Sequence, residues 1–166
     1  MASKQKNLSK HKALEIPSAS KFRIGMVVSE YNEDITFSLM SAAAETLKNY
    51  GVKEKNIFIE FVPGAYELPL AAKWLYQSRK ADAIICLGCV IKGDTDHDVY
   101  INHAVSDAIM KLNTETNAPF VFGLLTPNNL QQAKDRAGGK HGNKGVECAV
   151  AALKMLALKE NLAKKK

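Results

Sequence analysis

The sequence lacks any long hydrophobic run, and this absence sets the first limit on what the chain can be. In its 166 residues no apolar stretch approaches the roughly 20 residues that a membrane-spanning helix needs. The opening segment, MASKQKNLSKHK, has charges but no hydrophobic stretch behind them, so we expect no secretory signal. It also lacks the arginines and periodic apolar residues of an organelle presequence. We therefore expect a cytoplasmic protein without a membrane partner.

The sequence also lacks a set of paired cysteines. Its three cysteines, Cys86, Cys89 and Cys148, are an odd number in a chain without a secretion signal, which argues against a disulfide framework. Cys86 and Cys89 form a C-x-x-C inside the apolar run AIICLGCVI, whereas a redox pair belongs at a helix N-terminus. No second cysteine or histidine pair has zinc spacing, so we expect no metal. The cysteines are best interpreted as small buried hydrophobic residues.

A basic patch is missing from the body of the chain, although the net charge is +6. Residues 1–21 carry a net +4 and the last three lysines add +3, so the segment between them is close to −1. A nucleic-acid-binding domain would carry its positive charge on the folded surface. We expect the charged ends to serve solubility, and no nucleic-acid partner.

The composition and length indicate one globular domain with charged ends. The chain is 46% hydrophobic and long enough to bury a substantial core. We divide it into a flexible, polar, basic tail over 1–20, a single α/β domain over 21–159 and a basic C-terminal tail over 160–166. Neither an internal repeat nor a linker is visible.

Apolar runs alternate with amphipathic segments along the domain. Continuous apolar runs predict four strands, at 22–28, 56–62, 81–91 and 119–125. Apolar residues at helical spacing predict a helix after each strand, including a short one ending in Gly138-Gly139, and a last helix from about Lys144. Strands alternating with helices imply a parallel sheet, and continuous apolar strands imply helices on both faces. The predicted fold is a three-layer α/β/α sandwich with a flavodoxin-like parallel sheet.

The loops that follow the strands are the expected binding region, because ligands of such sheets bind at the carboxyl ends of the strands. The loop GDTDH (93–97) stands where a helix begins, so free backbone N–H groups could bind an anion there. His97 could transfer protons near neutral pH. The alternatives are N-capping by Thr95 or Asp96 and a histidine that is merely on the surface.

Two further loops could bind ligand groups. In DRAGGKHGNKG (135–145), Arg136 and Lys144 could face an anion, and an arginine fork suits phosphate. This stretch lacks the ending of a P-loop, and a plain helix–turn–helix connection is its alternative, with His141, like His103, on the surface. In VPGAYELP (62–69), Glu67 could accept hydrogen bonds from hydroxyls. Tyr31, at the end of the first strand, could stack on a heteroaromatic ring or simply pack.

Together these stretches resemble one family. SEYN, PGAYELPLAAK, LGCVIKGDTDHD, FGLLT and DRAGGKHGNKGVE, in this order and spacing, are similar to the 6,7-dimethyl-8-ribityllumazine synthases over about residues 22–158. The resemblance implies a transferase that condenses 5-amino-6-(D-ribitylamino)uracil with 3,4-dihydroxy-2-butanone 4-phosphate and releases phosphate and water. This is the penultimate step of riboflavin biosynthesis, and it needs no cofactor. The alternative from another class is a flavodoxin-like FMN-binding or regulatory module, although the acidic SEYNED would repel phosphate.

The resemblance also assigns roles to individual residues. His97 matches the proton-transfer histidine, Asp94, Thr95 and Arg136 match the groups that bind the butanone phosphate, and Glu147 matches a supporting residue. The residues that match the pyrimidine and ribityl site are Tyr31, Asn32, Ala65, Tyr66, Glu67, Cys89, Val90, Ile91, Phe122 and Lys144. In the family, Phe122 and Arg136 would come from the neighbouring subunit.

The resemblance implies a homopentamer in which each site lies between two subunits. The GGKHGNKG turn has no insertion between the last two helices, which resembles the members of the family whose pentamers associate into a sixty-subunit shell, so we expect such a shell. The chain departs from the family pattern in three places. Tyr31 replaces a more usual phenylalanine, Asp98 stands where an aromatic is common and could pair with His97, and Gly139 and His141 flank Lys140 where threonine and alanine are frequent.

Overall fold

The computed structural model describes Ser9 and residues 19–164. Its main strands are β1 (Ile24–Ser29), β2 (Ile57–Val62), β3 (Ala83–Cys89) and β4 (Phe120–Leu125). Its helices are α1 (Glu33–Asn49), α2 (Leu68–Arg79), α3 (His97–Thr116), α4 (Leu130–Arg136) and α5 (Lys144–Ala163). A short hairpin of β5 (Ala137–Gly139) and β6 (Gly142–Asn143) separates α4 from α5. All four predicted strands and the helices between and after them are therefore present.

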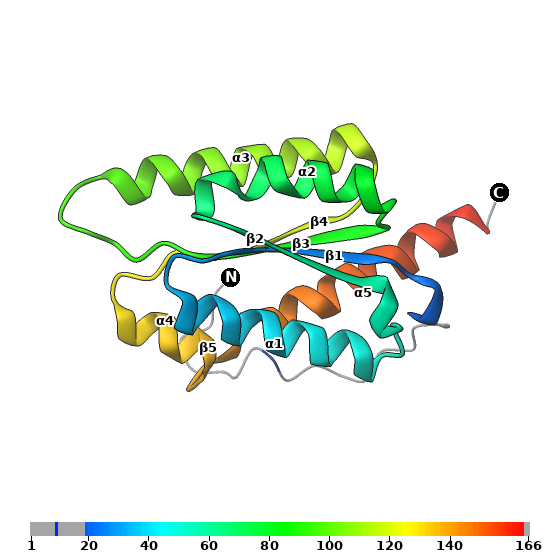
Figure 1. Cartoon of the computed structure of the whole chain (residues 1–166), viewed down its shortest axis with the longest axis horizontal. Helices are drawn as coiled ribbons and strands as arrows, with labels where there is room; N and C mark the ends of the chain where they lie inside the picture. The colour runs from blue at the N-terminus through cyan, green and yellow to red at the C-terminus, as the bar shows by residue number, and fades with distance from the viewer. Residues whose placement is uncertain (1–8, 10–18, 165–166) are drawn as a thin grey trace.

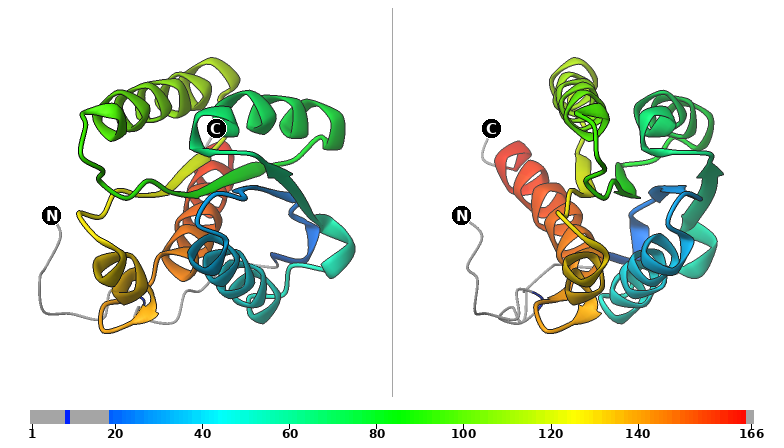
Figure 2. Two further views of the ribbon diagram at one scale, coloured as in Figure 1. Left: turned by 60° about the vertical axis from the view of Figure 1, so that its left-hand side comes forward. Right: turned by 90° about the vertical axis from the view of Figure 1, so that its left-hand side faces the viewer.

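The four main strands form one parallel sheet in the order β2-β1-β3-β4. Figure 1 shows α2 and α3 on one face of this sheet and α1, α4 and α5 on the other, and the end-on view in Figure 2 shows the same layers. The predicted three-layer α/β/α sandwich is confirmed. The order matches the first four positions of the flavodoxin-like sheet, and the described residues add no fifth strand to it, so the likeness to flavodoxin is loose.

The core consists of two apolar layers, one on each face of the sheet. The central strands β1 and β3 are buried along their whole length, as their continuous apolar sequences predict. On one face Leu39 and Leu153 pack against the sheet, and on the other Leu68 and Ile109 do so. Burying a side chain of this size contributes about 2 kcal/mol. The loops at the carboxyl edge are thus carried by a rigid sheet.

The segment after α4 differs from the sequence prediction. The short helix ends at Arg136, and Gly138 and Gly139 belong to β5, which pairs antiparallel with β6. The prediction that the short helix ends in Gly138-Gly139 is therefore wrong by two residues. The alternative of a plain helix–turn–helix connection is wrong as well, because a tight hairpin that uses the positive φ angles of Gly138 and Gly142 lies between the helices.

The structure describes the two predicted tails to different extents. Helix α5 continues to Ala163, four residues into the segment predicted as a C-terminal tail. Of the predicted N-terminal tail, 1–8 and 10–18 lie outside the described residues. Ala19, which the prediction also placed in that tail, is buried in the core.

Helices α1 and α5 approach each other closely at the start of α5. A Cβ at Gly145 would overlap the backbone carbonyl of Leu39. Glycine at this position lets the first turn of α5 lie against α1, which fixes where the side chains of that turn are presented.

All three cysteines are free and buried, as predicted. Burial raises the pKa of Cys86 and Cys148 to about 12, and that of Cys89 to about 11. They are protonated, unreactive thiols at neutral pH. Within the described part of the chain, no helix is both long and apolar enough to cross a bilayer.

Candidate active site

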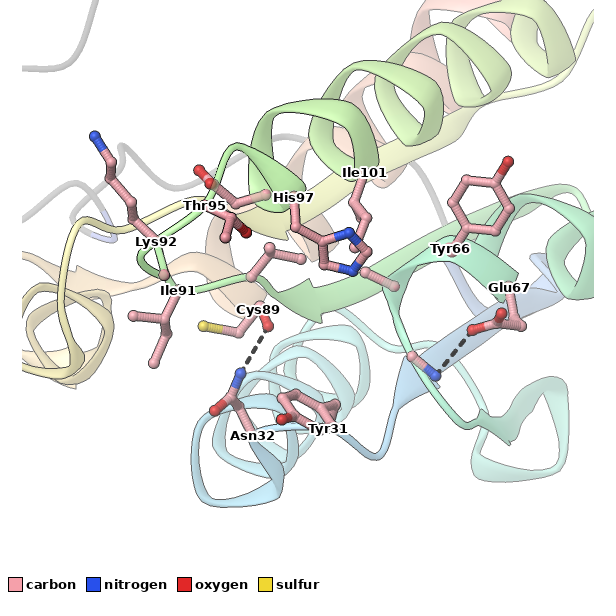
Figure 3. Close-up of a pocket in the computed structure, with 15 residues that line it drawn as sticks. Tyr31, Asn32, Tyr66, Glu67, Cys89, Ile91, Lys92, Thr95, His97 and Ile101 are labelled. Carbon is pink, nitrogen blue, oxygen red and sulfur yellow. Dashed lines mark hydrogen bonds between the residues drawn. The ribbon is translucent and has the colours of Figure 1, made fainter.

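A cavity of about 680 Å³ lies at the carboxyl edge of the sheet, where the sequence predicted a site. This volume is in the range of small-molecule sites. The residues that line this edge cavity are Tyr31, Asn32, Gly64, Ala65, Tyr66, Glu67, Cys89, Val90, Ile91, Lys92, Gly93, Thr95, His97, Asp98 and Ile101. Loops after β1, β2 and β3 and the first turns of α3 therefore meet here (Figure 3).

Tyr31 presents its ring from the loop that follows β1. Its backbone N–H donates to the Pro63 carbonyl at 3.2 Å, so the loop stays attached to the end of β2. The side chain is 74% exposed, and it lines the cavity from below in Figure 3. An exposed aromatic face beside a cavity can stack on a planar ring, and the Tyr31 ring is free to do so.

The turn 64–67 forms a second wall. The Gly64 N–H donates to Glu67 Oε2 at 3.1 Å, which holds the carboxylate against its own turn. Ala65 is buried and anchors the turn, whereas Tyr66 and Glu67 are exposed. Glu67 still has acceptor capacity for a hydroxyl-bearing ligand, because a carboxylate offers several lone pairs.

The end of β3 forms the floor of the cavity. Cys89 is buried, and its carbonyl accepts a hydrogen bond from Asn32 Nδ2 at 2.9 Å. The Val90 N–H donates to the Leu125 carbonyl, so this segment continues its pairing with β4 beyond the strand. The backbone of 89–91 is thereby held as an extended edge along the cavity.

His97 is the first residue of α3, and its exposed ring points toward the cavity (Figure 3). The N-cap residue Asp96 makes no side-chain capping bond, and the described structure gives Thr95 no such bond either. The capping alternative for this loop is therefore wrong. The free N–H groups of the first turn remain available to an anion at this end of the cavity.

Asp98 does not pair with His97. Its Oδ1 is buried without a hydrogen-bond partner among the described residues, and no ion pair joins the two side chains there. The expected contact between them is therefore not made.

Several cavity residues were not among the predicted site residues. Lys92, Gly64 and Gly93 line the cavity beside predicted neighbours, and Ile101 lies one helical turn beyond His97. The i, i+4 spacing of His97 and Ile101 was the signal that could have identified Ile101. Asp94, in contrast, was predicted to touch phosphate and is exposed but outside the cavity lining.

Besides Asp94, four predicted residues do not line the edge cavity. Phe122 lies on the edge strand β4 with its side chain partly exposed. Arg136, Lys144 and Glu147 form a separate group, which we call the Glu147 cluster. Arg136 Nη2 forms an ion pair with Glu147 Oε1 at 2.8 Å, and Lys144 Nζ lies 3.5 Å from Oε2 of the same carboxylate. Arg136 also donates to the His141 carbonyl at 2.9 Å, so its guanidinium is held from two sides.

The Glu147 cluster is fixed to α1 through the hairpin. Ser38 donates to the Ala137 carbonyl at 2.7 Å, and Asn143 Nδ2 donates back to the Ser38 carbonyl at 3.3 Å. Asn143 also caps α5 by accepting from the Gly145 N–H at 2.8 Å. His141, which the sequence analysis placed on the surface, is only partly exposed in this turn.

The cavity carries none of the features of a metal centre. Within the residues that the structure describes, no three histidine, cysteine or acidic side chains are close enough together to hold a metal ion. The fold and the cavity define the chain as an α/β protein with a cavity of small-molecule size at the carboxyl ends of its strands, and His97 lines that cavity.

Comparison with known proteins gives the particular family. The family model described as 6,7-dimethyl-8-ribityllumazine synthase matches residues 21–160, and the chain belongs to this family. A relative of that name from Cytophaga hutchinsonii is 51% identical over 157 residues, covering 95% of this chain and 98% of the relative. Relatives of the same name from Parabacteroides distasonis and Phocaeicola vulgatus are 47% and 46% identical, and cover 94% and 99% of this chain and 98% of each relative.

The match decides between the two classes of function that the sequence left open. The chain is a transferase of riboflavin biosynthesis with the activity for which the family is described. The flavodoxin-like binding module is not supported.

Proposed function

We propose that the chain condenses 5-amino-6-(D-ribitylamino)uracil with 3,4-dihydroxy-2-butanone 4-phosphate, releasing phosphate and water, with the edge cavity as the main part of the active site. The observation that carries this proposal is the convergence on one cavity of an exposed aromatic ring, an acceptor turn, an extended backbone edge and a histidine. Each is a group that one of the two substrates requires.

The pyrimidine would bind in the part of the cavity near Tyr31. Its ring stacks on the Tyr31 ring, and the backbone of 89–91 borders its polar edge. The ribityl chain extends along the turn 65–67, where the Glu67 carboxylate accepts from hydroxyls. Binding both substrates in register supplies much of the rate, since it replaces a bimolecular encounter with an oriented one.

The butanone phosphate would bind at the start of α3. Free N–H groups of its first turn and the Thr95 hydroxyl face the phosphate, and Lys92 adds a cation of the same chain. Asp94 contributes its backbone to this loop. Stabilising the charge of the departing phosphate lowers the barrier to its loss.

His97 would carry the proton transfers. The attacking amine loses protons as it adds to the ketone, and the carbinolamine takes up a proton to lose water. One imidazole can accept in the first step and donate in the second. The position of His97 between the ring-stacking wall and the anion end of the cavity suits both steps. No cofactor is required by this chemistry.

The complete site would lie between two chains in a homopentamer. Phe122 and Arg136 do not line the cavity of their own chain, and a neighbour could supply both. Phe122 would close the pyrimidine pocket and Lys144 would line it, while Arg136 would bind the butanone phosphate and Glu147 would hold the two cations in place. We further propose that pentamers form a sixty-subunit shell and that the chain acts in the cytoplasm, where three free thiols are expected.

The test of the activity is to mix the purified chain with both substrates. We expect the fluorescent lumazine product and one phosphate per product. A folded chain that forms neither contradicts the proposal, and stoichiometric flavin absorbance in the purified protein would instead support a flavin-binding module.

Sedimentation tests the assembly. A megadalton species supports the shell, and a species near five times 18.2 kDa supports an isolated pentamer. An active monomer would contradict the shared site.

A further inference from the structure

Asparagine precedes three of the helices, and one of these asparagines behaves differently from the other two. Asn129 and Asn143 cap α4 and α5 in the ordinary way, each accepting from a backbone N–H two or three residues ahead at 2.9 and 2.8 Å. Asn32 makes no capping bond to α1. Its amide instead donates to the Cys89 carbonyl on another strand.

The backbone of Asn32 is also unusual. Its φ of 60° and ψ of 47° place it in the left-handed region. Among the described residues, the only other non-glycine residues with positive φ are Lys80 and Asn117, which end α2 and α3, where this conformation is common. At the start of a helix the conformation has no such routine explanation, and asparagine tolerates it better than most residues. The strained residue lies beside the cavity.

The bond from Asn32 joins the segment after β1 to the last residue of β3, and these are the two strands whose pairing stops earliest at the carboxyl edge. We call this junction the β1–β3 seam. The β1–β3 pairing ends at Val28 and Leu87. On the outer sides the pairing continues further. Tyr31 N–H donates to the Pro63 carbonyl beyond β2, and Lys92 N–H donates to the Pro127 carbonyl beyond β4. The cavity lies over the β1–β3 seam. Without the Asn32 side chain, the segment after β1 and the end of β3 would therefore lose the hydrogen bond that joins them there.

We propose that Asn32 is a positioning residue. Its side-chain amide makes the last hydrogen bond between the β1 and β3 segments at the carboxyl edge, and this bond sets the spacing between the Tyr31 ring and the backbone of 89–91. The inference rests on the proposed function, because these are the two surfaces that would bracket the pyrimidine. It replaces the expectation that Asn32 contacts the substrate. In this proposal the Asn32 amide acts through its bond to the Cys89 carbonyl rather than by touching the substrate.

The test uses Asn32→Gly and Asn32→Asp. Both residues accept the left-handed backbone, and both lose the amide donor. The matched control is Asn129→Gly, which removes a true helix cap outside the cavity. We expect the Asn32 variants to raise the KM for the pyrimidine roughly tenfold while the KM for the butanone phosphate stays within about twofold. The control should lower the thermal midpoint and leave both KM values unchanged.

A second readout does not depend on activity. Amide hydrogen exchange of Glu30, Tyr31, Val90 and Lys92 should quicken in the Asn32 variants and not in the control, because these amides flank the seam. A raised KM without faster exchange would mean that Asn32 touches the substrate directly, and unchanged exchange or an equal rise of both KM values overturns the proposal. If the wild-type chain forms no lumazine, the proposed function fails, and the exchange result still decides the role of the seam.

Discussion

The edge cavity and the Glu147 cluster differ in how exposed their side chains are and in how those side chains are held. In the cavity, Tyr31 is 74% exposed and the His97 ring has no hydrogen-bond or ionic partner among the described residues. In the cluster, the Arg136 side chain is only 21% exposed and is held by Glu147 and the His141 carbonyl. One region is open to receive a ligand. The other is a prearranged set of charges on a second surface, which suits a group that completes a neighbour's site.

The largest expected effect comes from the open region. His97→Ala should lower turnover by roughly ten- to a thousandfold, because acid–base catalysis is usually worth 10²–10⁴ and water can replace the imidazole in part. Single-turnover kinetics with both substrates measures the change. The matched control is His103→Ala, an exposed histidine further along α3 that does not line the cavity. Equal turnover in the two variants would mean that His97 is a surface residue without a role in catalysis.

The next largest effect is expected from a substitution in the Glu147 cluster. Arg136→Ala should raise the KM for the butanone phosphate by about ten- to a hundredfold, because a charge-assisted, two-pronged contact to phosphate is lost. Arg136→Lys, which keeps the charge without the planar fork, should lie in between. Steady-state kinetics with each substrate varied separately provides the values. If both KM values rise equally, the cluster does not serve the phosphate.

Mixing two impaired variants, assayed with the butanone phosphate well below its KM, tests whether the regions belong to different chains. Joint refolding of His97→Ala with Arg136→Ala at equal amounts should restore about a quarter of the wild-type activity, because a random ring creates sites with both groups intact at one interface in four. The two variants refolded separately and then mixed are the control. An absence of recovery would place His97 and Arg136 in the site of one chain.

The smallest expected effect concerns the three buried cysteines. Cys89 forms part of the cavity floor, and Cys148 lies close enough to Lys144, Glu147 and Arg136 to respond to their charges. Since burial keeps all three thiols protonated, a disulfide reagent at neutral pH should label none of them in the folded chain, and all three in urea. Faster labelling of Cys148 than of Cys89 would show that the cluster is the looser region.

The same burial predicts a dependence of stability on pH. A thiol of the unfolded chain loses its proton near the ordinary pKa of 9.0, whereas Cys86 keeps its proton in the fold up to about 12. The folded state therefore binds more protons between these values, so the free energy of unfolding falls as the pH rises from about 9 to about 12. Urea titrations of the wild type and Cys86→Ala should show a shallower fall in the variant.

Local patterns in the sequence were enough to predict the strands and helices. The apolar runs predicted β1 and β3 because a strand buried on both faces must be continuously hydrophobic. The rule that ligands bind at the carboxyl ends of strands was enough to locate the cavity around Tyr31, Glu67 and His97. These inferences depend on the residue itself or on neighbours within a few positions.

What the sequence could not show depends on contacts between distant segments. The bond from Asn32 to Cys89 joins residues 57 positions apart and needs a left-handed backbone that an N-cap asparagine does not signal. The hairpin β5–β6 is too short and too rich in glycine to show a strand period. The ion pair of Arg136 and Glu147 became visible only once α4 and α5 were placed.

The absence of a side chain at Gly145 also limits how this protein can be altered. Gly145→Ala would change neither charge nor polarity, and a comparison of the two residues alone would predict a small effect on the protein. Its methyl group would nevertheless meet the Leu39 carbonyl and force the first turn of α5 away from α1. Lys144 and Glu147 would move with that turn. Position 145 therefore sets the distance between α5 and α1. One carbon added there would displace the charged side chains of the Glu147 cluster.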